Sequence, residues 1–258
     1  MDKIKYVLQN LIFIPGVVLS TIICALLVIV IAFFGRRSPL LKKIEYIWAK
    51  IIVWAAGVEI ENNQDQLSKL DQNKCYIFIS NHFSHLDIPI IVTILKGFSP
   101  RFVAKESLFK IPIFGWGMKA VGHIPIHRKN KRQALRDLNK AVETLKKGES
   151  VLIFPEGTRN TNEDRLLDFQ VGPFILAIKL GLEMVPITIY GTNRCLPKGS
   201  IFTKPSKVYV RVHNPLDWPK KYTIKQREDL KNTTQDHMQK KYLELLKWVK
   251  EKKSLYIQ

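Results

Sequence analysis

The sequence has 258 residues, of which 46% are hydrophobic, so it is long and apolar enough for one well-filled domain and is not an intrinsically disordered chain. Its 41 Lys and Arg residues against 22 Asp and Glu give a formal charge of +19, which indicates an anionic partner such as nucleic acid, anionic lipid or an acidic protein. The three cysteines lie far apart and form no CxxC pair, which argues against a disulfide-stabilised secreted domain and favours a reducing, cytoplasm-facing compartment.

The first predicted element is an uncharged apolar helix over residues 11–34. About 20 apolar residues cross a bilayer, so this run is long enough to span one, and it is too long for the apolar core of a cleaved signal peptide. Pro15 and Gly16 can bend such a helix, so a re-entrant segment in one leaflet and a full crossing both stay open. Basic residues are more numerous after the run, where Arg36, Arg37, Lys42 and Lys43 lie, than before it, where Lys3 and Lys5 lie. This asymmetry predicts that the rest of the chain lies in the cytoplasm.

The second predicted element is an amphipathic helix over residues 40–56. Apolar residues recur there at helical spacing, two of them tryptophans suited to a membrane interface, and polar residues including Glu45 fall between them. The alternative is a helix of the main domain that packs on its sheet. We expect residues 1–60 to form a membrane-associated helical hairpin that anchors a domain formed by residues 61–258.

The remainder alternates strands with helices after a polar stretch at 62–73. Strands are predicted at 76–80, 101–104, 122–126, 151–154, 184–190 and 207–213. Helices are predicted at 86–95, 112–120, 131–147, 173–180 and 224–253. This interleaving predicts an α/β fold with a mostly parallel or mixed central sheet flanked by helices.

A polar stretch, Asn81-His-Phe-Ser-His-Leu-Asp87, follows the first strand of this pattern. His82 and Asp87 would lie about 140° apart on a continuous helix, so they meet only if the chain turns between them. A tight loop would let the carboxylate orient the imidazole as a general base. Two alternatives remain: a loop histidine beside a carboxylate at a helix start, and a zinc site that adds His85 and either His123 or His127.

Two further strand ends carry polar groups. Residues 155–159, Pro-Glu-Gly-Thr-Arg, follow one strand, and Lys105 follows another. Arg159 offers a two-pronged donor for a phosphate or carboxylate, although a tight turn with a Glu156–Arg159 ion pair is the simpler interpretation. Because the carboxyl ends of parallel strands meet at one edge of a sheet, a base, an arginine and a lysine there favour a site for a phosphorylated substrate.

These residues resemble the sequence blocks of the glycerolipid acyltransferases. Residues 81–87 look like their H-x4-D block, and Phe-Pro-Glu-Gly-Thr-Arg at 154–159 looks like their FPEGTR block. Residues 105–112 together with Ile126-His127-Arg128 are similar to the block between those two, and Val185-Pro186-Ile187 resembles the fourth. The resemblance covers about residues 75–190, with four blocks in the right order.

The resemblance implies transfer of a fatty acyl chain from acyl carrier protein or acyl-CoA to the sn-2 hydroxyl of 1-acylglycerol-3-phosphate (lysophosphatidic acid), giving phosphatidic acid. His82 would then be the base and Asp87 its orienting partner. Arg159 would bind the phosphate in a pocket shaped by Glu156, Gly157 and Thr158, with Lys105 as a second cation. Related enzymes often carry a lysine at the position of Gln170, so a substrate contact from that residue is not expected.

The same resemblance implies no metal and no cofactor besides the acyl-thioester co-substrate. It also places the protein at the cytoplasmic face of a bacterial inner membrane. Another lysolipid, such as lyso-ornithine lipid or a lysophospholipid, is the alternative acceptor. Nucleic acid is not an expected partner, because the chain has no aromatic-rich basic motif.

Overall fold

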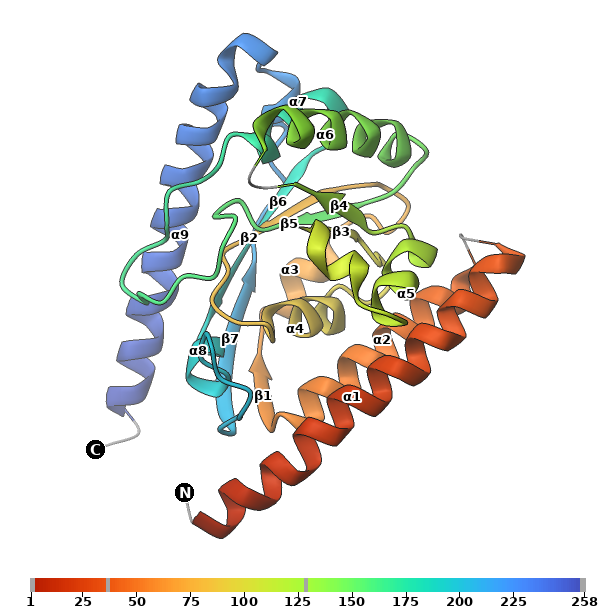
Figure 1. Ribbon diagram of the computed structural model, residues 1–258. Coiled ribbons are helices and arrows are strands. Elements are labelled where there is room, and N and C mark those ends of the chain that lie inside the picture. The colour runs from red at the N-terminus through yellow and green to blue at the C-terminus, as the bar shows by residue number, and fades with distance from the viewer. Residues whose placement is uncertain (1–2, 36–37, 128–129, 256–258) are drawn as a thin grey trace.

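The computed structural model describes residues 3–35, 38–127 and 130–255. The predicted basic residues Arg36 and Arg37, and Arg128 of the third sequence block, lie outside the described residues. Figure 1 shows a central sheet with helices on both sides and the long N-terminal helix along one flank.

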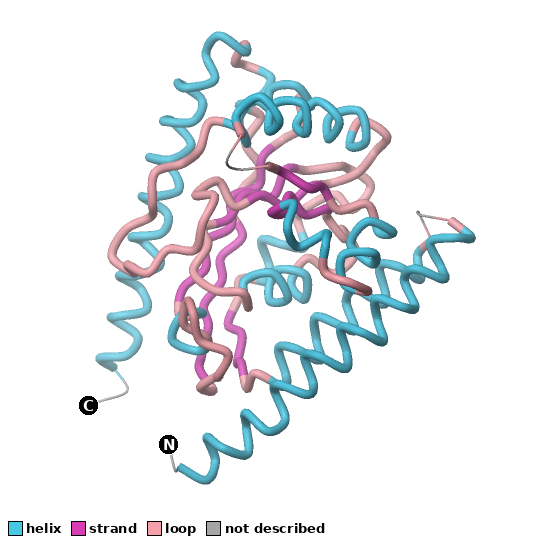
Figure 2. Tube along the Cα trace, in the orientation of Figure 1, coloured by secondary structure: helices cyan, strands magenta, loops and turns pink. Residues whose placement is uncertain are grey.

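The sheet has seven strands in the order β1-β7-β6-β2-β5-β3-β4. All neighbouring strands run parallel except β6 and β7, which are antiparallel. Figure 2 shows the strands together in the middle of the fold. Their bounds are β1 Val58–Glu61, β2 Ile77–Ser80, β3 Arg101–Lys105, β4 Ile124–Ile126, β5 Val151–Ile153, β6 Met184–Tyr190 and β7 Ser206–Val212. The predicted α/β class with a mostly parallel, mixed sheet is therefore confirmed.

Each face of the sheet is buried by its own set of helices, because successive strand side chains point to opposite faces. On β2, Phe78 joins the core under α2 (Pro39–Ala55) and α4 (Asp87–Ile94), whereas Ile77 and Ile79 join the core under α6, α7 and α9. The last three helices span Lys131–Leu145, Gly172–Leu180 and Arg227–Leu255. Strands buried on both faces read as continuous apolar runs, which is why β2, β5 and β6 were predictable.

The N-terminal helices pack against each other and against the sheet domain. Helix α1 (Lys3–Phe34) runs unbroken through Pro15 and contacts α2 and α5 (Phe114–Val121), while α2 also packs on α4. The approach of α1 to α5 is close, since a Cβ added at Gly117 would lie 3.0 Å from the Cβ of Ala25. Residues Tyr6–Phe34 are long and apolar enough to cross a membrane, and only 17% of their most apolar stretch is buried.

Several short elements were not predicted. Strand β1 lies where a boundary at residue 60 was expected, and it pairs with β7 at the sheet edge. Its four residues, Val-Glu-Ile-Glu, are too few to stand out as a period-two pattern. The polar stretch at 62–73 contains the short helix α3 (Gln64–Ser68). The turn helix η1 (Glu106–Lys110), the short helix α8 (Thr192–Cys195), and η2 (Trp218–Lys220) and η3 (Ile224–Gln226), which precede α9, complete the fold.

Candidate active site

The polar strand ends predicted from the sequence meet at one edge of the sheet. Strands β2, β5, β3 and β4 are neighbours and parallel, so the residues that follow them lie along a common carboxyl edge. His82 comes two residues after β2, Glu156 three residues after β5, and Lys105 is the last residue of β3. This is the edge at which open α/β sheets bind their ligands.

His82 and Asp87 are in direct contact. The chain turns between them, α4 begins at Asp87, and His82 Nδ1 lies 2.7 Å from Asp87 Oδ2. The same oxygen accepts the backbone N–H groups of Phe83 at 2.7 Å and Ser84 at 2.8 Å. A carboxylate only accepts hydrogen bonds, so Nδ1 carries the hydrogen and Nε2 is left to accept a proton. Asp87 is fully buried, and its Oδ1 has no hydrogen-bond partner among the described residues.

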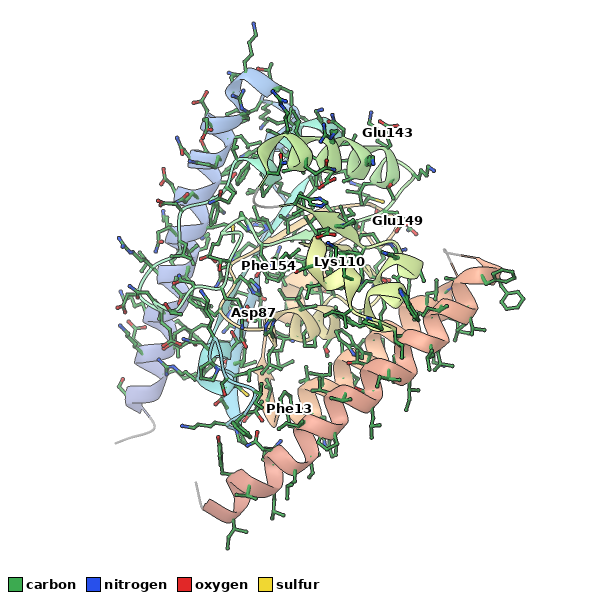
Figure 3. The ribbon with its side chains drawn as sticks, in the orientation of Figure 1. Phe13, Asp87, Lys110, Glu143, Glu149 and Phe154 are labelled. Carbon is green, nitrogen blue, oxygen red and sulfur yellow. The ribbon has the colours of Figure 1, made fainter. Side chains whose placement is uncertain are left out.

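The segment after β5 holds the His82 backbone in place. Glu156 Oε1 accepts the His82 N–H at 2.7 Å and Oε2 accepts the Leu167 N–H at 2.9 Å, while the His82 carbonyl accepts the Asn160 N–H at 2.7 Å. The His82 ring stacks on Phe154 with centroids 4.2 Å apart (Figure 3 labels Phe154 and Asp87). Glu156 therefore connects two segments, since one of its oxygens accepts a backbone N–H of the loop after β2 and the other a backbone N–H of its own loop after β5.

Burial governs the protonation of Glu156. Removal from water, with a smaller contribution from the Asp87 charge, raises the pKa of Glu156 from 4.5 to about 7, although its two backbone hydrogen bonds act in the opposite direction. Gly157 follows with φ +68°, a left-handed backbone conformation, and a Cβ there would lie 3.2 Å from Gln170 Cγ. Glycine is thus required for the turn that leads to Arg159.

Of the expected phosphate ligands, Thr158 and Arg159 follow Gly157 directly, whereas Lys105 lies on another strand. The Arg159 side chain is half-buried, and its positive charge is near enough to His85 to lower the pKa of that imidazole, an effect second to burial. The backbone carbonyl of Arg159 accepts a hydrogen bond from Lys198 Nζ at 3.0 Å. Thr158 is exposed at the turn, and Lys105 is exposed at the end of β3, two strands away from β2.

An apolar cavity of about 570 Å³ begins beside the histidine loop. Its walls come from α1, α2, α4, α5 and the loop after α8, and His85 and Leu86 form part of them. Most of its lining is hydrocarbon, as shown by Phe13, Val17, Pro89 and Met118. A chain-like apolar ligand fits such a space better than a polar metabolite does.

Sequence reasoning missed some residues of this region and misplaced one. Glu45 was expected on the polar face of a membrane-surface helix, but it lies in the cavity wall, where burial raises its pKa to about 7. Phe154 was predicted as the end of a strand and as the first residue of the FPEGTR-like block, but no sequence signal marks it as the residue on which the His82 ring stacks. No group of three His, Cys, Asp or Glu side chains in the described part of the chain is arranged to hold a metal ion.

Comparison with known proteins identifies the family. The sequence profile of the acyltransferase family matches residues 58–190, which is half of the chain. The chain belongs to the acyltransferase family. All of the strand-end residues described above fall inside the matched segment.

Individual acyltransferases are also similar in sequence to this chain. A chloroplastic 1-acyl-sn-glycerol-3-phosphate acyltransferase of Arabidopsis thaliana is 34% identical over 76% of this chain and 55% of its own length. A 1-acyl-sn-glycerol-3-phosphate acyltransferase of Borreliella burgdorferi is 34% identical over 77% of each chain. The chain thus spans about half the length of the Arabidopsis relative and more than three quarters of the bacterial one.

A solved structure covers nearly the whole acyltransferase chain. The crystal structure of the 1-acyl-sn-glycerophosphate acyltransferase PlsC from Thermotoga maritima superposes with a TM-score of 0.77 and is 27% identical in sequence. The match covers 95% of this chain and 98% of that one, so it includes the N-terminal helices as well as the sheet domain.

Proposed function

We propose that this acyltransferase transfers a fatty acyl chain from an acyl carrier protein or CoA thioester to the sn-2 hydroxyl of lysophosphatidic acid, giving phosphatidic acid. The observation that carries the proposal is the His82–Asp87 contact of 2.7 Å at the carboxyl edge of the sheet, beside an apolar cavity. The names of the relatives, including that of the Thermotoga protein, support the choice of acceptor.

The chemistry follows from the protonation pattern of the pair. His82 Nε2 removes the proton of the acceptor hydroxyl as its oxygen attacks the thioester carbonyl, and the Asp87 carboxylate stabilises the imidazolium that forms. When the tetrahedral intermediate collapses, the C–S bond breaks and the imidazolium returns its proton to the departing thiolate. General-base catalysis of this kind contributes about 10²–10⁴-fold in rate.

Binding of the two substrates is assigned to the groups around the pair. We assign the phosphate to Arg159 on the Gly157 turn, with Thr158 beside it and Lys105 as a second cation, because a guanidinium binds phosphate through two parallel hydrogen bonds. Glu156 acts on His82 through the backbone. The apolar cavity is assigned to a lipid chain.

We assign the membrane anchor to α1 and α2, since exposed apolar residues cover the outer side of α1. A formal charge of +19 suits anionic lipid and an acidic carrier protein, and orientation at the cytoplasmic face of a bacterial inner membrane fits the basic residues that follow α1.

The test is incubation of the detergent-purified protein with lysophosphatidic acid, a lysophospholipid and lyso-ornithine lipid, each with acyl carrier protein and CoA thioesters. We expect phosphatidic acid from lysophosphatidic acid as the main product by mass analysis. If only another lysolipid were acylated, the proposed acceptor would be wrong, while acyl transfer to a lysolipid would still be the reaction. Absence of transfer to all three would refute the proposal.

A further inference from the structure

Two polar side chains stand out in the mostly apolar wall of the cavity. Glu45 of α2 and His123, which directly precedes β4, both form part of its wall. The other polar groups of the wall on α1 and α2 satisfy each other, because the Trp48 Nε1–H donates to the Thr21 hydroxyl at 3.0 Å. Glu45 and His123 therefore need a separate explanation.

The pair lies at the opposite end of the cavity from the catalytic histidine. Ser99, whose hydroxyl donates to Glu45 Oε2, precedes β3, and His123 lies level with Phe102, the second residue of β3. His85 follows β2 and marks the carboxyl edge. At about 3.3 Å per residue, the level of His123 is roughly 10 Å from the carboxyl end of β3 along the strand.

The hydrogen-bonding capacity of the pair is not used up. Glu45 Oε2 is bonded to Ser99, but Oε1 is buried with no hydrogen-bond partner among the described residues. His123 Nδ1 accepts the Phe102 N–H at 3.2 Å, so the ring hydrogen is on Nε2, which lies 3.5 Å from Glu45 Oε1. That distance is at the limit of a hydrogen bond.

Neighbouring charges do not neutralise the carboxyl group directly. Arg101 is the first residue of β3 and faces this region. Its Nη2 lies 3.0 Å from Glu149 Oε2, so its charge is already paired. Burial raises the pKa of Glu45 to about 7, opposed by its Ser99 bond and then by the Arg101 charge, and burial lowers that of His123 to about 3. His123 is thus neutral, and Glu45 exists in both protonation states near neutral pH.

We propose that Glu45 and His123 form a polar subsite at the end of the cavity remote from His82, which binds a hydroxyl group carried near the far end of a lipid chain. The inference rests on the proposed function, since it assigns the rest of the cavity to that chain. The transferred acyl chain and the chain of the acceptor present the same chemistry to this subsite.

A hydroxyl is the group that suits this pair. It donates to the Glu45 carboxylate or accepts from the protonated form, and it also accepts from the His123 Nε2–H. An unsubstituted chain brings only hydrocarbon and leaves Oε1 unpaired, which is unfavourable in a buried site. One such hydrogen bond corresponds to a preference of about tenfold for the hydroxylated chain.

The experiment compares palmitoyl-CoA with 16-hydroxypalmitoyl-CoA as donors to lysophosphatidic acid, using the full-length protein in detergent. A second arm keeps palmitoyl-CoA and places the terminal hydroxyl on the acyl chain of the acceptor. The readout is the ratio of kcat/KM for the hydroxylated and plain chains in the wild type, Glu45→Leu, Glu45→Gln and the control Thr21→Val, which removes a polar group of the same wall. A thermal shift with palmitic and 16-hydroxypalmitic acids measures chain binding independently of turnover.

We expect the ratio in one arm to fall about tenfold in Glu45→Leu and to be largely kept in Glu45→Gln and Thr21→Val. Equal ratios in the wild type and Glu45→Leu in both arms would overturn the subsite, even if plain palmitoyl transfer were normal. Loss of all transfer by the wild type would instead refute the proposed function, and equal thermal shifts from the two acids would then overturn the subsite as well.

Discussion

The protein contains two histidine–aspartate pairs of nearly identical local geometry at the same edge of its sheet. In both, the imidazole Nδ1 lies 2.7 Å from a carboxylate oxygen: His82 with Asp87 after β2, and His127 with Asp137 after β4. In both, the same oxygen also accepts a backbone N–H. A search for such pairs alone would not tell them apart.

Their surroundings differ. The His82 ring is 14% exposed, stacks on Phe154 and belongs to the loop that lines the apolar cavity through His85. The His127 ring is 41% exposed, and its Nε2 lies 3.9 Å from the Glu106 carboxylate. The His82 ring therefore belongs to the loop beside the cavity, whereas the His127 ring links η1 to α6. We predict that these surroundings, rather than the contact at Nδ1, distinguish a general base from a structural clamp.

Removal of the two imidazoles is the strongest test of this distinction. His82→Ala should lower kcat by about 10²–10⁴-fold, because it removes the group that takes the acceptor proton. The matched change His127→Ala should leave kcat within about threefold, as a half-exposed clamp contributes little to the rate. Turnover is measured with purified variants whose thermal unfolding has been checked. Similar losses in both variants would contradict the comparison.

Neutralising the two carboxyl groups separates orientation from proton transfer. Asp87→Asn should lower kcat by about 10²–10⁴-fold, because an amide N–H2 facing Nδ1 favours the wrong imidazole tautomer and cannot stabilise the imidazolium. Asp137→Asn should leave kcat nearly unchanged and act only on stability. The pH dependence of kcat/KM for Asp87→Asn provides the check, since a merely structural role would not alter its profile.

The next largest kinetic effect is expected from replacing the arginine near the catalytic pair, with an arginine near the second pair as its control. Arg159→Ala should lower kcat/KM for lysophosphatidic acid by about 10–100-fold, mainly through KM, because a charged hydrogen bond to phosphate is lost. Arg136, which bonds to Gln133 on α6 beside the second pair, is the matched control, and Arg136→Ala should not change KM. An unchanged KM in Arg159→Ala would show that Arg159 does not bind the phosphate of the acceptor.

The smallest effect concerns pH and stability. The folded-state pKa of Glu156 is raised from 4.5 to about 7, so its carboxyl group keeps its proton in the folded protein while the unfolded chain releases it. The contribution of Glu156 to the free energy of unfolding should therefore fall as pH rises from about 4.5 to 7, by about 3 kcal/mol. Glu45, also shifted to about 7, adds a similar fall. His123, whose folded-state pKa is lowered to about 3, contributes in the opposite direction over part of this range.

Glu156→Gln should remove the Glu156 contribution and leave those of Glu45 and of the buried histidines unchanged, so the two proteins should differ by about 3 kcal/mol in the change between pH 4.5 and 7. Denaturant unfolding of both proteins between pH 4 and 8 measures it. The Asp137 pair behaves in the opposite way: burial alone would raise the pKa of Asp137, but its hydrogen bonds from His127 and Gln133 hold it below its usual value. A decline of equal size in the wild type and in Glu156→Gln would show that Glu156 is not the group responsible.

Much of this arrangement was predictable from local pattern. The apolar runs gave six of the seven strands and the main helices, and the strand that was missed, β1, is four residues long and pairs only at the sheet edge. His82 and Asp87 lie five residues apart within one loop, so one turn of the chain brings them together. His127 and Asp137 are ten residues apart on different elements, and no spacing rule pairs them.

The sequence by itself determined the α/β alternation, the apolar first helix and the chemistry of the strand-end residues, because periodicity and residue type act over short stretches of chain. Only the tertiary structure decided that the His82 ring stacks on Phe154 and that Glu45 faces a cavity instead of solvent. Those properties depend on contacts between segments that are far apart in the chain and meet only when the whole fold is formed. The two imidazoles share the same contact at Nδ1 and differ in what folds against them.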